Sequence, residues 1–402
     1  MATSIETIWP SSKIRDLCDV SRGSSPRPIA DQRYFQDGHI PWIKIADATK
    51  SGKYLYKTKE YVNAYGASFS RLLPAGTIIV AASGTLGYTQ ILGVPGCAHD
   101  GWLILTNLRN FDSDYAYYVL QQMQRHFYNS AYGAAIQNIN TEILRETEIP
   151  CPPLHTQRKI GAVLSAYDDM IENNARRIKI LEEMAQSLYR EWFVKFRFPG
   201  HQHARFTDSP LGPIPEGWEA VKVGDILKKV KRGDKIQKQD YAAEGLIPVV
   251  DQGKEFIGGY TDNAESLISY DLPLIIFGDH TRVLKFIDFP FACGADGTQL
   301  LKSDDERMPM TLFYYALLSI DLSDFAYARH FKFLKEEALA LPAKSIADRF
   351  DQFVSPLRDQ TRSLMQKNTT LRRTRDLLLP RLISGEVDVS ELDITVPEEV
   401  AA

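Results

Sequence analysis

The chain has 402 residues, of which 44% are hydrophobic, 11% aromatic and 24% charged. These fractions are ordinary for a folded protein and exclude a wholly disordered chain, and the length favours two or three domains. The formal net charge of -4 excludes a strongly basic DNA-coating protein but allows a nucleic-acid binder with local basic patches.

The cysteine content and the N-terminal sequence indicate a cytoplasmic protein. Four cysteines are too few for a disulfide framework, so we expect a reducing compartment. Residues 1–16 lack the charged start and apolar run of a signal peptide. No apolar stretch reaches the roughly 18 residues that span a bilayer, so we expect no membrane contact.

Residues 1–148 are predicted to form a first mixed domain. Short apolar runs predict strands at Pro41–Ile45, Thr77–Ala81 and Leu103–Thr106, and Tyr115–Phe127 is predicted to be helical. Strands and helices do not alternate regularly, so we expect an α+β fold and not a doubly wound sheet.

Residues 149–198 are predicted to form a long helix after the proline cluster Ile149–Pro153. Apolar residues recur there in alternating steps of four and three, the pattern of a coiled-coil seam. The predicted packing residues are Ile160, Leu164, Tyr167, Ile171, Ile178, Leu181 and Leu188. Residues 199–216 are rich in proline and are predicted to be a linker.

Residues 217–340 are predicted to form a second mixed domain that repeats the first. Strands are expected at Leu274–Phe277 and Phe286–Phe289, and a helix at Thr311–Leu318. Weak matches occur in the same order in both halves, which indicates an internal duplication. The matches pair Gly38–Lys44 with Gly245–Val250, Cys97–Gly101 with Cys293–Gly297, and Ala116–Tyr118 with Phe313–Tyr315.

Residues 341–385 are predicted to form a second long helix with the same seam spacing, ending at Gly385. Its packing residues are Phe350, Val354, Leu357, Leu364, Leu371, Leu378 and Leu382. We expect the two narrow seams to pack on each other; packing on two separate cores is the alternative. Pro356 should kink or interrupt the helix, and Asn174 and Asn368 on the seams are hypothesised to fix its register.

Residues 386–402 contain six acidic and no basic residues and are predicted to be a disordered tail.

The sequence contains none of the common catalytic motifs: no P-loop, GxGxxG, HExxH or GxSxG. Pro150-Cys151 resembles the nucleophilic dipeptide of cytosine methyltransferases, with Glu172-Asn173 as a second element. A stand-alone DNA cytosine methyltransferase using Cys151 therefore stays an alternative, although no glycine-rich loop for a methyl donor precedes it. We expect no catalytic residue and no metal site.

Polar and basic segments form a candidate DNA-binding surface. Lys228–Lys238 has six basic residues and one acid, and polar loops follow the strands at Thr77–Ala81 and Leu274–Phe277. A solvated face or an ordinary polar loop looks similar. The candidate DNA-binding residues are Arg22, Lys44, Lys53, Ser83, Thr85, Tyr88, Gln90, Lys229, Lys231, Arg232, Lys235, Gln252, His280, Thr281, Arg282 and Lys285.

Nearly the whole chain resembles the specificity (S) subunit of type I restriction–modification systems. The resemblance is carried by Ile149–Ile160, Leu181–Phe193, Asp348–Leu357 and Leu371–Glu386, with weaker support from Gly38–Ile43 and Ser83–Gly87. It implies two target-recognition domains separated by two long antiparallel coiled-coil helices, with a pseudo-twofold internal repeat. Each domain would bind one half of an interrupted target on double-stranded DNA.

The same resemblance implies that the chain is not an enzyme and binds no cofactor. Two methylation (M) subunits would dock on the helices and bring S-adenosylmethionine, and restriction (R) subunits would bring ATP and Mg²⁺. Together they would make an adenine-N6 DNA methyltransferase and an ATP-dependent endonuclease. A coiled-coil scaffold without DNA function is the remaining alternative.

Overall fold

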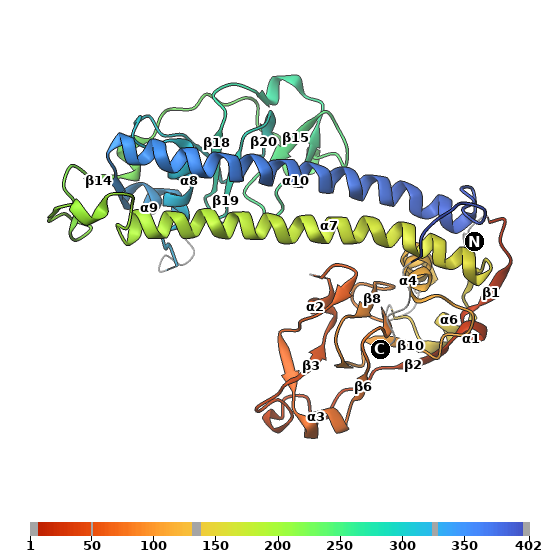
Figure 1. Ribbon diagram of the computed structural model, residues 1–402. Helices are drawn as coiled ribbons and strands as arrows, with labels where there is room; N and C mark the ends of the chain where they lie inside the picture. The colour runs from red at the N-terminus through yellow and green to blue at the C-terminus, as the bar shows by residue number, and fades with distance from the viewer. Residues whose placement is uncertain (1–6, 50, 131–137, 324–328, 397–402) are drawn as a thin grey trace. The chain divides into compact units, whose positions relative to one another are not determined.

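The computed structural model describes residues 7–49, 51–130, 138–323 and 329–396 and divides into two compact units. Unit 1 contains residues 1–176 and 365–402, and unit 2 contains residues 177–364. Two long helices, α7 (Leu154–Tyr189) and α10 (Lys344–Ser384), each begin in one unit and end in the other (Figure 1). Each unit therefore combines a mixed α/β globular part with a segment of both helices.

Two mixed sheets form the globular part of unit 1. The five-stranded sheet has the order β2 (Asp19–Arg22), β10 (Trp102–Thr106), β7 (Ile78–Ala81), β8 (Thr89–Leu92) and β4 (Tyr54–Leu55). The four-stranded sheet has the order β5 (Glu60–Val62), β3 (Ile40–Ile43), β9 (Gly96–Ala98) and β6 (Arg71–Leu73). The helices are α1 (Ile14–Leu17), α2 (Ile45–Ala48), α3 (Ala64–Ser68), α4 (Ser113–Gln122), α5 (Gln124–Ser130) and α6 (Thr141–Glu146). The predicted helix Tyr115–Phe127 is thus split at Met123 into α4 and α5.

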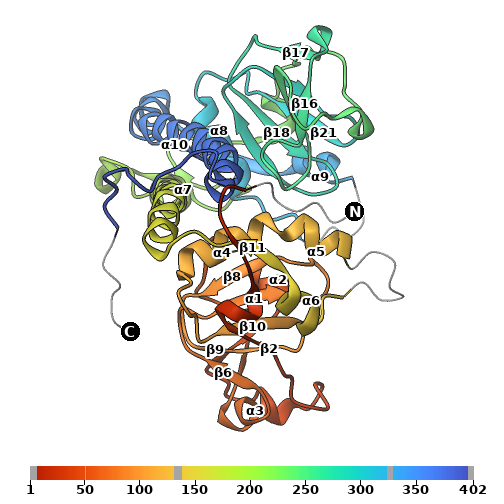
Figure 2. The same ribbon diagram turned by 90° about the vertical axis from the view of Figure 1, so that its right-hand side faces the viewer.

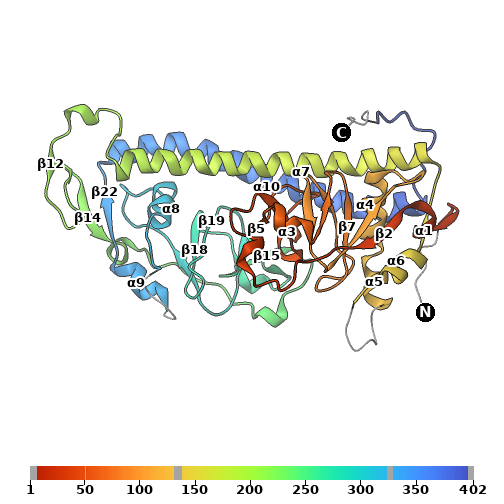
Figure 3. The same ribbon diagram turned by 90° about the horizontal axis from the view of Figure 1, so that it is seen from below.

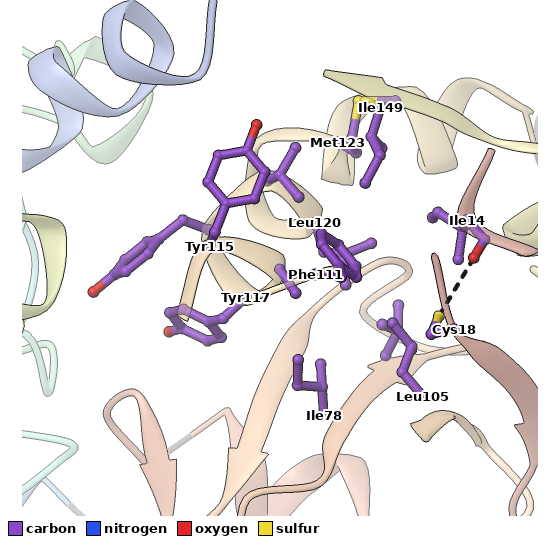
Figure 4. Close-up of a cluster of buried hydrophobic side chains, with 14 of the residues drawn as sticks. Ile14, Cys18, Ile78, Leu105, Phe111, Tyr115, Tyr117, Leu120, Met123 and Ile149 are labelled. Carbon is purple, nitrogen blue, oxygen red and sulfur yellow. Dashed lines mark hydrogen bonds between the residues drawn. The ribbon is translucent and has the colours of Figure 1, made fainter. Parts of the chain in front are cut away.

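One buried core joins the larger sheet of unit 1 to the long helices. Successive strand residues point to opposite faces, so Ile78 lies in this core and Ile79 in a second cluster on the other face. Figure 4 shows Ile78 and Leu105 from the sheet facing Tyr115 and Leu120 of α4. The same cluster continues through packing residues of both α7 and α10, so these helix segments are part of the domain core.

The globular part of unit 2 repeats this arrangement, with three strands in place of five in the first sheet. Its three-stranded sheet has the order β19 (Leu284–Ile287), β18 (Leu274–Gly278) and β21 (Thr298–Leu301). Its four-stranded sheet has the order β16 (Gly259–Thr261), β15 (Ile247–Val250), β20 (Phe291–Cys293) and β17 (Leu267–Ile268). The helices are α8 (Met310–Leu318) and α9 (His330–Glu336), and β14 (Glu219–Lys222) pairs with β22 (Ala338–Leu341). Figure 3 shows α8 beside the long helices.

Strand pairing supports the internal duplication. In each four-stranded sheet one pair is parallel: β3 with β9, where Trp42 faces Cys97, and β15 with β20, where Val249 faces Ala292. These strands overlap the segments that match between the two halves of the sequence. The expected fold class, two mixed domains with long coiled-coil helices, is confirmed.

Within each unit the segments of α7 and α10 run side by side and antiparallel (Figures 1 and 2). In unit 1 the side-chain amide of Asn174 donates to Asn368 Oδ1 at 2.9 Å, and Asn368 Nδ2 donates to the Ile171 carbonyl at 3.2 Å. In unit 2 the ring centroids of Trp192 and Phe350 lie 6.1 Å apart. The two seam asparagines thus form a hydrogen bond to each other across the seam, as a pair that fixes the helix register requires.

Pro356 was expected to kink or interrupt the second long helix; the expected interruption was wrong, because α10 continues through Pro356. Proline removes one backbone donor and crowds the preceding turn, and the packing of its neighbours on the unit 2 core offsets this cost. Val354 is fully buried in the unit 2 core, and Leu357 packs against that core.

The predicted linker and the tail that was predicted to be disordered both make ordered contacts where the structure describes them. The linker contains a short hairpin of β12 (Phe206–Thr207) and β13 (Ile214–Pro215). In the tail, Val389 is buried in the unit 1 core, and Lys159 Nζ donates to the Ser390 carbonyl at 2.6 Å. The acidic composition of the tail did not predict this order, because apolar side chains between the acidic residues pack in a core formed by distant segments. Residues 397–402 lie outside the described residues.

Candidate nucleic-acid interface

The turn between β18 and β19 exposes three of the predicted DNA contacts, His280, Thr281 and Arg282. The turn is closed because the Arg282 N–H donates to the Gly278 carbonyl at 2.8 Å. Arg282 adopts a left-handed φ of 61°, and its Nη1 donates to the Leu322 carbonyl at 3.0 Å. This bond orients the side chain and uses one of the five guanidinium N–H donors, so other donors remain available for DNA.

Gln252 ties the same turn to the loop between β20 and β21. Its Nε2 donates to the Asp296 carbonyl at 2.9 Å, and its Oε1 accepts from the His280 backbone N–H at 3.1 Å. Its own carbonyl accepts from Thr281 Oγ1 at 2.6 Å. Gln252 was predicted to contact DNA, but both ends of its amide are used inside the protein, so the structure gives it a positioning role.

Buried Asp279 holds the turn in place through hydrogen bonds to other segments. The Asp279 N–H donates to the Gly297 carbonyl at 2.7 Å, and its carbonyl accepts from the His330 N–H at 2.9 Å. Its Oδ1 accepts from the Phe331 N–H at 2.8 Å. Asp279 was not among the predicted DNA contacts, although it directly precedes His280 in the sequence.

The corresponding turn in unit 1, residues 82–88, has the same backbone anchors. The Ala82 N–H donates to the Gly101 carbonyl at 2.8 Å, and the Ala82 carbonyl accepts from the Ile139 N–H at 2.9 Å. On this turn Thr85 is exposed, while Ser83 and Tyr88 are half-buried. Burial raises the pKa of Tyr88, whose hydroxyl donates to the Ala48 carbonyl at 3.2 Å. Both globular parts therefore hold a polar turn on one backbone framework with different side chains.

Most of the predicted basic contacts lie at the surface, and some have partners there. Lys229, Lys231, Arg232 and Lys235 are exposed, and Arg232 Nη2 donates to Gln299 Oε1 at 2.9 Å. In unit 1, Arg22 is exposed and donates to the Asp100 carbonyl at 2.8 Å, whereas half-buried Lys44 lies 2.5 Å from Glu60 Oε1. Exposed pairs of this kind cost little to break, so phosphate can compete for the cations.

Lys53 must be corrected, because its side chain is buried. Its Nζ lies 2.6 Å from both Asp114 Oδ1 and Ser165 Oγ. It also lies between about 5 and 6 Å from the ring centroids of Tyr54, Tyr117 and Tyr118, within cation–π range. Lys53 thus makes a core contact and is not part of a DNA surface, whereas Tyr56 and Lys57 of the same segment are exposed.

Gln90 and Lys285 are also buried and need the same correction. Gln90 Nε2 donates to the Gly52 carbonyl at 2.6 Å. Lys285 Nζ donates to the Asp251 carbonyl at 2.8 Å, and burial lowers its pKa although Asp251 opposes this shift. Gln90 lies on β8 and Lys285 on β19, where neighbouring segments cover them. The sequence had placed both residues in polar loops, so their burial was not predicted.

The predicted seam residues differ in how far their side chains are buried. Those that are buried are Ile160, Leu164, Ile171, Phe350, Val354, Leu364 and Leu382. Those that are half-buried are Tyr167, Ile178, Leu181, Leu188, Leu357, Leu371 and Leu378.

The chemistry of Cys151 does not favour a nucleophile. Burial raises its pKa, which is the opposite of thiolate activation. Its sulfur accepts from Gln157 Nε2 at 3.6 Å, at the entry to α7. Among the described residues no cluster of three or more potential metal ligands occurs, and none of their helices is long and apolar enough to cross a membrane.

Comparisons with known proteins point to one family. Residues 7–183 match the family described as the type I restriction modification DNA specificity domain. The chain is 27% identical to the type I restriction enzyme MjaIX specificity subunit of Methanocaldococcus jannaschii, covering 96% of this chain and 94% of that protein. It is 22% identical to the MjaVIII specificity subunit of the same organism, covering 59% and 53%. The crystal structure of a type I restriction–modification S subunit from M. genitalium shares the fold, with a TM-score of 0.60 and 19% identity over 95% of this chain and 98% of that one.

Proposed function

Because the chain belongs to the family of type I restriction–modification specificity subunits, we propose that it selects the DNA target of such a complex and is itself non-catalytic. Each globular part binds one half of an interrupted double-stranded target. The observation that carries this proposal is the duplicated framework, in which turns 82–88 and 279–283 share their backbone anchors. Since the two turns differ in side chains, the two half-sites should differ in sequence.

The paired segments of α7 and α10 set the gap between the half-sites and dock two M subunits. Those subunits bring S-adenosylmethionine and the methyl transfer to adenine N6, and R subunits bring ATP, Mg²⁺ and cleavage. Because the substrate is the cell's DNA, we place this action in the cytoplasm. Ile180 and Met184 of α7, which are 54% and 52% exposed, leave apolar surface on this helix that supports docking there.

Methylation assays test this proposal and separate it from its alternatives. Purified chain alone, S-adenosylmethionine and DNA should give no methyl transfer, whereas addition of the M subunits should methylate one interrupted adenine motif. Methyl transfer by the chain alone would support the Cys151 enzyme instead. Loss of the gene without loss of any methylated motif in the host would support the scaffold.

Arg282→Ala is expected to weaken recognition of one half-site by about 1–3 kcal/mol, the range of a lost bidentate base contact. The measurement is binding of the assembled complex to targets changed one base pair at a time. Arg205→Ala, which removes an exposed linker arginine, is the matched control and should leave discrimination unchanged. Equal discrimination in Arg282→Ala and the parent would reduce Arg282 to a phosphate contact or a bystander.

A further inference from the structure

A tyrosine, a carboxylate and an arginine meet where the globular part of unit 1 joins the long helices. Tyr118 of α4 donates its hydroxyl hydrogen to Asp168 Oδ2 of α7 at 2.6 Å. The other carboxylate oxygen, Oδ1, accepts a charged hydrogen bond from Arg375 Nη1 of α10. One carboxylate thus links three elements, and Figure 2 shows α4 beside α7.

Unit 2 contains the same arrangement built from different residues. Tyr315 of α8 donates its hydroxyl hydrogen to Glu182 Oε2 of α7 at 3.0 Å. Glu182 Oε1 accepts from Arg358 Nη1 of α10. We call these two sets of residues, Tyr118–Asp168–Arg375 and Tyr315–Glu182–Arg358, the junction clamps.

The clamps are not simple copies of one another. Tyr118 and Tyr315 occupy equivalent positions in the internal repeat. The carboxylates do not: Asp168 follows the seam residue Tyr167, but the residue that follows the matching seam residue, Leu357, is Arg358. The carboxylate lies on α7 and the arginine on α10 in both units. Sequence duplication alone would not place a tyrosine–carboxylate–arginine contact at both junctions.

Burial makes the tyrosine a permanent donor in each clamp. Burial, and then the charge of Asp168, raise the pKa of Tyr118. Burial, and then the charge of Glu182, raise the pKa of Tyr315. Each hydroxyl therefore keeps its proton at any physiological pH and holds a carboxylate that the arginine already orients.

We infer that the junction clamps are positioning devices that fix the angle of each globular part on its helix segments and thereby the gap length that the complex accepts. This inference rests on the proposed function. A hydrogen bond to an ion is directional, whereas apolar packing around it tolerates small rotations. Because α7 and α10 run through both units, a loosened angle at either junction changes the separation at which both half-sites can be bound.

The test uses Tyr118→Phe, Tyr315→Phe and the double variant, each assembled with the M subunits. Methylation rates are measured on the parental target and on targets whose gap is one base pair shorter or longer. We expect the preference for the parental gap to fall about tenfold, as for one lost hydrogen bond to an ion, while the rate on the parental target changes little. Tyr117→Phe is the control, because the Tyr117 hydroxyl accepts from Gln121 within its own helix.

An unchanged gap preference in both single variants, or an equal fall in Tyr117→Phe, would overturn the inference. Thermal unfolding of each variant is measured in parallel, and loss of the folded state would also overturn it, since the hydroxyl would then maintain the fold and not the angle. Asp168→Asn and Glu182→Gln repeat the test from the acceptor side and should lower the gap preference too. If the parental complex methylates no interrupted target, the proposed function itself fails.

Discussion

Phe350→Ala is expected to lower the free energy of unfolding of unit 2 by about 3–5 kcal/mol, the usual cost of emptying a buried aromatic site. Phe350 is fully buried, and its ring centroid lies 5.1 Å from that of Phe193 and 6.3 Å from that of Tyr315. It therefore joins the seam of α10 to the π-helical turn Arg190–Val194 that follows α7 and to α8. Native-state hydrogen exchange of β18 amides measures this loss within unit 2 without assuming that both units unfold together.

Phe353→Ala is the matched control for this substitution. Phe353 lies on the same helix but is 52% exposed, and its ring centroid lies 5.9 Å from that of Trp192 in an edge-to-face arrangement. Its loss should cost at most about 1 kcal/mol. Similar losses for the two variants would show that the seam does not carry the stability of unit 2.

Lys53→Met is expected to lower the free energy of unfolding of unit 1 by about 3 kcal/mol, because it leaves a partly buried carboxylate without its cation. Methionine preserves most of the length and apolar contact of lysine but cannot donate to Asp114 and Ser165. Denaturant unfolding followed by exchange of β7 amides is the measurement. Base discrimination by the assembled complex should be unchanged, since Lys53 lies inside the protein.

Two variants check the reason for this loss. Lys57→Met removes an exposed lysine four residues away and should change stability by less than about 0.5 kcal/mol. Adding Asp114→Asn to Lys53→Met removes the unpaired charge and should restore part of the lost stability. A double variant as unstable as the sum of its single substitutions would contradict the ion-pair explanation.

The polar turns show which features of the site local sequence can predict and which it cannot. Their location after the β7 and β18 strands was predictable, because a buried apolar run followed by polar residues indicates a strand end. The role of Gln252 was not, since its amide partners, His280 and Asp296, come from two other loops. The junction clamps were missed for the same reason: each draws its three side chains from three separate elements.

The sequence by itself determined the two long helices, their seam spacing, the mixed domains and their duplication. These features follow from periodicities of two and 3.6 residues and from a repeated order of segments, which are local properties of the chain. Only the tertiary structure decided which polar side chains face water. Lys53 and Gln90 are buried while His280 is exposed, because burial depends on what distant segments place around a residue. Tertiary packing also buries Val389 of the acidic tail in the unit 1 core, and α10 continues through Pro356 as one helix, two outcomes that composition could not predict.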